Sequence, residues 1–199
     1  MKPRGTIRER IIRVLLDEPN GALTKYQLAK KAESSYPWAH EFINKLEDQK
    51  FVRGTTVIDF TGLVNYWLQI KTKPEKKEYL HKDPISIIRK TRLTYALTTY
   101  QAESLVQHYL FPSRIDLYIR KEEAERWHQL LTNKGLVGKG NVRLLITDPH
   151  VFYGSSKRQN LTVVSIPQLI VDLLEEGGVC AEAAEKLITK VEQHAIQVY

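Results

Sequence analysis

Three short helical segments in close succession restrict the fold of this chain more than any other feature. Ile, Val and Leu recur at helical spacing over residues 4–17, and the turn-forming run at residues 18–21 then ends that helix. Thr24 is a capping residue in front of a second helix, residues 25–32, and a proline suits the first turn of a third helix, residues 37–49. The sequence therefore predicts a group of three helices near the N-terminus.

The apolar residues indicate which side of each helix faces the core. In the first helix Arg8, Arg10 and Arg13 lie on the side opposite to the apolar residues. The residues expected to face inward from the second and third helices are Tyr26, Leu28, Ala29, Ala39, Ile43 and Leu46.

A β-hairpin is expected directly after the third helix. Two short β-prone runs, residues 51–53 and 56–58, flank a turn at Gly54. Helix, helix, turn, helix and hairpin is the element order of a winged helix-turn-helix. One more helix, residues 61–71, is expected to complete this first domain, which we assign to residues 1–72.

The rest of the chain alternates strand-like and helix-like segments, which predicts a mixed α/β domain. Residues 73–78 are polar and contain a proline, so they are expected to form a linker, with the second domain at residues 79–199. Strands are expected at residues 115–119, 142–146 and 161–164, and helices at residues 99–109, 121–132, 167–174 and 181–194. The predicted fold class is thus α+β: an N-terminal winged helix-turn-helix followed by a small mixed α/β domain.

Positive charge is concentrated in the first half of the chain. Residues 1–100 contain 19 Lys and Arg against 11 Asp and Glu, a net charge of +8, whereas residues 101–199 have a net charge of −1. Such an excess attracts polyanions, although a solvated basic face would have the same composition. Charge alone therefore agrees with nucleic-acid binding without requiring it.

The composition also indicates the compartment. The single cysteine, Cys180, permits no internal disulfide and no cysteine-based zinc site, and its simplest role is that of a small buried apolar residue. The basic start of the chain is not followed by an apolar stretch, and no apolar run is long enough to span a membrane. We therefore expect a cytoplasmic protein that does not enter the membrane.

The third helix has residues that a hydrophobic core does not need. Ser34, Ser35 and Tyr36 stand at its N-terminus, where hydroxyl groups, free N–H groups and the helix dipole suit a phosphate. Side chains expected on its other faces, within reach of base edges, are Trp38, His40, Glu41, Asn44 and Lys45. Asn can pair with adenine, and Lys with guanine or a phosphate. We therefore expect this helix to read duplex DNA, with Trp38 as the member that could instead lie partly in the core.

Three further cations are expected to support this interface. Lys25 and Lys30 lie on the second helix and are expected to bind phosphates, while Arg53 at the hairpin can bind a phosphate or enter a neighbouring minor groove. Winged helices also dock other proteins. A protein-interaction adaptor is therefore the main alternative, and a nucleotide- or RNA-processing enzyme is a third.

Catalytic motifs are poorly represented. The six histidines never fall in a metal-ligand spacing such as H-x-x-x-H, and Asp148 precedes a proline in an ordinary turn starter. Residues 154–158 resemble the Gly-Ser opening of nucleotidyltransferases, but no Asp-x-Asp pair follows to hold magnesium. The glycines at residues 135–140 lack the spacing of a phosphate-binding loop and indicate a flexible loop. We therefore expect no catalytic residues, no metal and no cofactor.

Several segments of the second domain resemble the AbiEi-type antitoxin family of transcriptional regulators. They are residues 95–102, 115–119, 148–153 and 163–174, together with Ala183-Ala184. The resemblance implies an N-terminal winged helix joined to this kind of C-terminal domain, and DNA binding near the protein's own operon. For some members it also implies neutralisation of a nucleotidyltransferase-type toxin.

The leading hypothesis is therefore a sequence-specific DNA-binding transcriptional regulator, with an antitoxin role as its more specific form. The expected partners are double-stranded DNA and, for an antitoxin, its cognate toxin. A homodimer is an assembly that the sequence leaves open.

Overall fold

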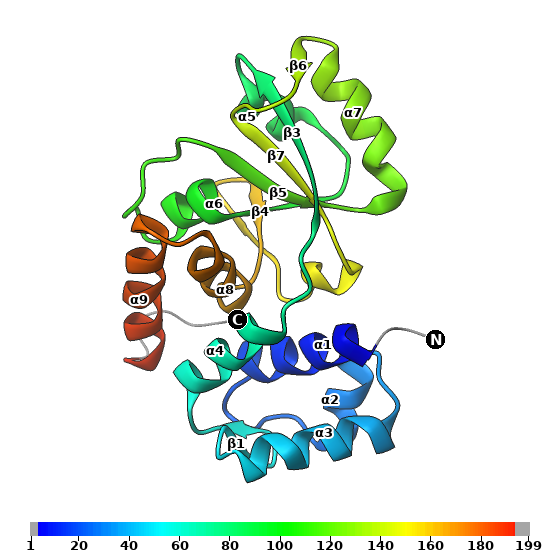
Figure 1. The fold of residues 1–199 in the computed structure, drawn as a ribbon, viewed down its shortest axis with the longest axis vertical. Coiled ribbons are helices and arrows are strands. Elements are labelled where there is room, and N and C mark those ends of the chain that lie inside the picture. Colours follow the sequence, from blue (N-terminus) through cyan, green and yellow to red (C-terminus); the bar gives the residue numbers. More distant parts are fainter. Residues whose placement is uncertain (1–3, 194–199) are drawn as a thin grey trace. The chain divides into compact units, whose positions relative to one another are not determined.

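The structure is a computed structural model that describes residues 4–193 and divides the chain into two compact units (Figure 1). The first unit contains the chain up to residue 72 together with residues 165–175 and the described residues from 184 onward. The second unit contains residues 73–164 and 176–183. The α+β class expected from the sequence is confirmed.

Among the described residues, six helices or parts of helices and one hairpin build the first unit. They are α1 (Arg4–Asp17), α2 (Lys25–Lys31), α3 (Tyr36–Asp48), β1 (Val52–Arg53), β2 (Thr56–Val57), α4 (Phe60–Ile70), α8 (Ile166–Glu176) and the larger part of α9 (Val179–Glu192). The first six elements lie within two residues of their expected bounds. Local signals explain this agreement, since Thr24 and Gln27 form a capping box on α2 and Asp59 accepts the Gly62 N–H at 2.7 Å to begin α4.

The hairpin pairs with the chain that leaves α1. Strands β1 and β2 are antiparallel, and Asn20 forms an isolated bridge to Thr56. Gly21 has a φ of +72°, and a Cβ added there would lie 2.2 Å from the Thr56 hydroxyl oxygen. Only glycine fits this left-handed and crowded position.

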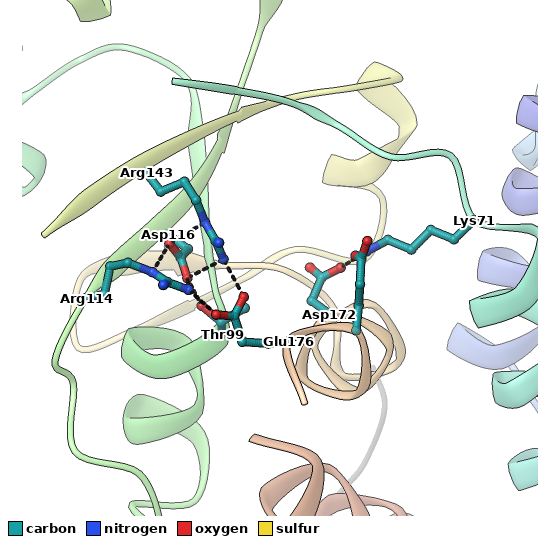
Figure 2. Close-up of polar contacts among 8 residues, drawn as sticks. Lys71, Thr99, Arg114, Asp116, Arg143, Asp172 and Glu176 are labelled. Atoms are coloured by element: carbon teal, nitrogen blue, oxygen red, sulfur yellow. Dashed lines mark hydrogen bonds and ion pairs between the residues drawn. The ribbon is translucent and has the colours of Figure 1, made fainter. Parts of the chain in front are cut away.

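Helix α8 belongs to the first unit, whereas the sequence placed it with all of residues 79–199 in the second domain. Residues 166–173 are all buried, so this helix needs neighbours on more than one side. Polar contacts join it to α1 and α4: Arg13 donates to Gln168 at 2.9 and 3.0 Å, and Lys71 Nζ lies 2.7 Å from Asp172 Oδ1 (Figure 2). The domain assignment therefore differs from the sequence-based one, because a distant segment completes the first core.

Two arginines of α1, Arg10 and Arg13, are buried together with its apolar residues. Arg10 is 1% exposed and pairs with Glu33 at 2.5 Å, and Arg13 lies with its guanidinium 5.1 Å from the Trp67 ring centroid. Much of the positive charge of this segment is thus used inside the unit. It is not available to a polyanion.

The second unit is built on a seven-stranded mixed sheet of order β6-β3-β7-β5-β4-β9-β8. The strands are β3 (Glu75–His81), β4 (Tyr95–Thr98), β5 (Ile115–Ile119), β6 (Gly135–Val137), β7 (Val142–Ile146), β8 (Ser156–Arg158) and β9 (Leu161–Val163). Pairs β5·β7 and β4·β9 are parallel, and the remaining pairs are antiparallel. Helices of this unit are α5 (Pro84–Lys90), α6 (Thr99–Val106), the 3-10 turns Lys121–Glu123 and Pro149–Phe152, and α7 (Ala124–Thr132), which packs against β3 and β6 (Figure 1).

Two segments of this sheet were expected to be irregular. The linker predicted at residues 73–78 is mostly β3, and the glycine-bearing segment at residues 135–140 begins with β6. Strand β3 is polar along most of its length and exists because it pairs with the buried strand β7. Tertiary pairing overrides composition here.

Among residues 4–193 no helix combines the length and the apolar content that crossing a membrane requires. Cys180 is fully buried, as its role as a small apolar residue predicts.

Candidate nucleic-acid interface

Helix α3 has one buried face and one outward polar face. Its inward residues are Ala39, Phe42, Ile43 and Leu46, which include the three expected from the sequence and add Phe42. Glu41 and Lys45 are exposed, and His40 and Asn44 are half-buried at the margin of the same outward face. The structure therefore brings four of the expected base-reading residues onto one side of a single helix.

Trp38 lies between these two faces. Its side chain is half-buried, and its ring centroid is 5.6 Å from that of Phe42. The Arg8 guanidinium lies 5.9 Å from the centroid of the same Phe42 ring. Trp38 thus has a packing role, as the alternative for this residue anticipated.

The N-terminus of α3 is open. Ser35 is the N-cap residue and its hydroxyl makes no capping hydrogen bond, while the Ser34 hydroxyl donates to the Ser35 carbonyl oxygen at 3.1 Å. Tyr36 and the proline after it begin the helix at an exposed position. The first-turn N–H groups therefore receive no side-chain cap from Ser35, which is the arrangement that suits an anion when other contacts also favour it.

An aromatic cluster adjoins this terminus. Tyr26 and Tyr36 have ring centroids 6.2 Å apart, Tyr36 and His40 are 5.7 Å apart, and Lys30 Nζ lies 5.8 Å from the Tyr26 ring. Tyr26 is 58% exposed, so the prediction that it faces inward is wrong. The seven-residue helix α2 buries only Leu28 and Ala29, and Tyr26 packs on Tyr36 at the surface instead.

Asn44 is held by its neighbours. Lys25 Nζ donates to Asn44 Oδ1 at 2.8 Å, and Asn44 Nδ2 lies 3.3 Å from His40 Nδ1. Lys25 also lies 3.4 Å from Glu47, and Lys45 pairs with Glu41 at 2.7 Å. Lys25 therefore orients the side chain of Asn44 and has its charge partly neutralised, in place of the free phosphate-binding role expected for it.

Glu47 connects α3 to the hairpin, and the sequence analysis missed it. Its Oε1 accepts the Gly54 N–H at 2.7 Å, and this hydrogen bond, followed by the interaction with Lys25, holds the pKa of Glu47 below its usual value. The exposed Arg53 directly precedes Gly54 in the hairpin turn. An acidic residue in the last turn of a helix, just before a tight turn with a free N–H, is the signal that could have identified Glu47.

Lys30, Lys50 and Arg53 are exposed cations of this surface without an ion pair among the described residues, and the half-buried Arg8 has none either. Arg10, Arg13, Lys25 and Lys45 are buried or paired. The positive surface is thus smaller than the composition of residues 1–100 suggests.

A second polar cluster lies inside the other unit (Figure 2). Asp116 is fully buried and receives hydrogen bonds from Arg114 at 2.8 and 2.9 Å, from Arg143 at 3.1 Å and from the Thr99 hydroxyl. Both arginines also donate to Glu176 at 2.7 Å. Burial alone would raise the pKa of Glu176, but the hydrogen bonds from the two arginines lower it.

This cluster balances two guanidinium groups with two carboxylates. The oxygens of Asp116 are occupied and enclosed, so the carboxylate has no room for a substrate contact. Within residues 4–193 no group of three or more His, Cys, Asp or Glu side chains is placed to hold a metal ion. We interpret the cluster as a structural connection between β5, β7 and residue 176.

Comparisons with protein-family models, with curated proteins and with solved structures give no match. The AbiEi resemblance and the winged-helix assignment therefore stay predictions.

Proposed function

We propose that the first unit is a winged helix-turn-helix that binds duplex DNA, and that the protein is a transcriptional regulator. The observation that carries this proposal is the outward face of α3, where His40, Glu41, Asn44 and Lys45 serve no core. The uncapped N-terminus of α3 and the hairpin held by Glu47 at the other end of the helix add to this support.

In this proposal α3 lies in the major groove. Asn44 reads a base edge, for which its planar amide offers both a donor and an acceptor, and Lys25 holds that amide in place. The Ser35 hydroxyl and the first N–H groups of α3 face a backbone phosphate, and Lys30 adds charge beside them. Arg53 reaches the backbone or the adjacent minor groove from the hairpin.

Duplex binding by the full chain over a salt series tests the proposal. Changing Arg53 to Ala removes one exposed cation, so binding to all sequences should weaken alike and the salt slope should fall by about one unit. Lys82→Ala, which removes an exposed cation from the second unit, is the matched control and should leave the slope unchanged. A folded Arg53→Ala variant with an unchanged slope would contradict the role of the hairpin.

The aromatic cluster supports one alternative. Exposed Tyr26 and Tyr36 are residues of the kind enriched in protein interfaces, so a protein-docking role for this face is the second candidate. Absence of any duplex binding at low salt by folded protein would favour this role over DNA binding.

The AbiEi resemblance makes the proposal more specific. A regulator of that kind would bind DNA near its own operon and, in its antitoxin form, would neutralise a nucleotidyltransferase-type toxin. Co-expression with a toxin gene found beside its own would test this role, and light scattering would test whether the chain forms a homodimer.

A further inference from the structure

A cavity of about 610 Å³, largely open to solvent, lies in the second unit between α7 and the segment that joins α5 to β4. It has room for a molecule of about nucleotide size, one side of which would stay exposed to solvent. Two arginines line it, Arg92 from the segment after α5 and Arg126 from α7.

One wall is a single face of helix α7 and its C-cap. Arg126, Gln129, Leu130 and Asn133 line the cavity, and their spacing of three, four and seven residues places them on one side of the helix. Trp127 and Leu131 of the same helix are buried in the core. The cavity-lining residues are therefore not required for the packing of α7.

The other wall is a short segment fixed by hydrogen bonds. The Leu93 N–H donates to the Thr91 hydroxyl at 3.1 Å, and the Thr94 N–H donates to Glu123 Oε2 at 2.8 Å. Leu93 is buried at the base of this segment. The backbone next to Arg92 is thus held in place by these two hydrogen bonds.

The lining has positive charge and no carboxylate. Arg126 lies 4.0 Å from Glu123, the outer limit of an ion pair, and Glu123 already accepts the Thr94 N–H. Arg92 has no ion pair among the described residues, and Arg89 precedes it in the last turn of α5. Two guanidinium groups beside an open cavity make the local potential favourable for an anion.

We propose that this cavity binds a phosphate group. The planar guanidinium donors of Arg92 and Arg126 match the oxygens of a phosphate, while Leu93 and Leu130 offer apolar surface and Gln129 and Asn133 offer amides to the rest of the ligand. The phosphate is carried either by a molecule of about nucleotide size or by a nucleic-acid backbone. This site lies apart in the sequence from the proposed DNA-reading residues and does not depend on that assignment.

Calorimetric titration of the full chain with pyrophosphate, ADP and adenosine tests the proposal. ADP and pyrophosphate should bind, and adenosine, which has no phosphate, should bind at least about tenfold more weakly, as the loss of charge-assisted hydrogen bonds requires. Arg92→Gln and Arg126→Gln should each weaken ADP binding by about tenfold or more. Arg89→Gln, which changes the net charge equally, is the matched control. It should change the affinity for ADP less than about twofold, because Arg89 does not line the cavity.

A second arm distinguishes the two sources of phosphate. If ADP and pyrophosphate do not bind but Arg92→Gln and Arg126→Gln weaken binding to a random duplex more than Arg89→Gln does, the ligand is a nucleic-acid backbone. If neither ligand binding nor duplex binding depends on Arg92 and Arg126, or if Arg89→Gln weakens binding as much as their replacement does, the proposal is wrong. Thermal melts of each variant ensure that a loss of binding is not a loss of folding.

Discussion

Asp17 is a buried carboxyl group in the first unit, and burial strongly disfavours its charged form. It is the last residue of α1 and is 3% exposed, and neither of its carboxylate oxygens has a hydrogen bond of good geometry. Burial raises its pKa from 3.8 to about 8, and the Ser165 hydroxyl and Arg13 oppose this only in part. The carboxylate also faces the negative end of its own helix.

The sign and size of the effect follow from this shift. Because the pKa of Asp17 is higher in the folded state than in the unfolded state, the folded protein binds the Asp17 proton more tightly at pH values between the two pKa values. The stability that protonated Asp17 contributes is fully present below about pH 4 and is lost as the pH rises to about 8. A shift of about four units corresponds to at most about 5–6 kcal/mol, and local rearrangement that admits water reduces this amount.

Asp17→Asn should therefore be more stable than the native chain at pH 9 by several kcal/mol, on the order of 2–5. Near pH 4 the two proteins should differ little. Urea denaturation followed by circular dichroism at pH 4, 7 and 9 measures the difference.

Asp48→Asn is the matched control, because Asp48 also ends a helix, α3, but is exposed. The free energy of unfolding of this variant should change with pH in the same way as that of the native protein. If the difference between Asp17→Asn and the native chain does not grow with pH, the burial argument for Asp17 is wrong.

Two further substitutions test packing. Gly21→Ala should destabilise the protein by about 2 kcal/mol or more in thermal melts, because the φ of +72° and the close approach of Thr56 both oppose a Cβ. Gly5→Ala is the control, since Gly5 has open space around it, and it should cause no loss of stability. Arg143→Gln should lower the free energy of unfolding by about 3–5 kcal/mol in chemical denaturation, because it leaves the buried Asp116 with only one guanidinium. If the effect is no larger than that of Arg89→Gln, at an exposed position, the structural role of the cluster is contradicted.

The elements that the sequence predicted well are those with local signals. Helix α1 was expected at its observed bounds, and so were strands β5 and β7, because periodicity, turn residues and short, mainly apolar runs act within one segment. The inward face of α3 was also correct apart from the omission of Phe42.

What the sequence could not supply depends on distant partners. Strand β3 was taken for a linker because its own residues are charged, and only pairing with β7 makes it a strand. Helix α8 was assigned to the second domain because its contact with Arg13 spans 155 positions of sequence. The contact between Lys25 and Asn44 joins two helices, so Lys25 looked like a free cation.

The central claim is that α3 reads DNA sequence through Asn44. Its most direct test compares Asn44→Ala with Asn65→Ala, which removes the same amide from an exposed position on α4. Binding of the full chain is measured by fluorescence anisotropy on a duplex selected from a random pool and on a scrambled duplex of the same composition.

The proposal predicts that Asn44→Ala loses about 1–3 kcal/mol of binding to the selected duplex and little to the scrambled one, so that the ratio between them falls. Asn65→Ala should keep the native ratio. Equal losses on both duplexes for a folded Asn44→Ala variant, or no loss on either, would contradict the assignment of α3 as the reading helix.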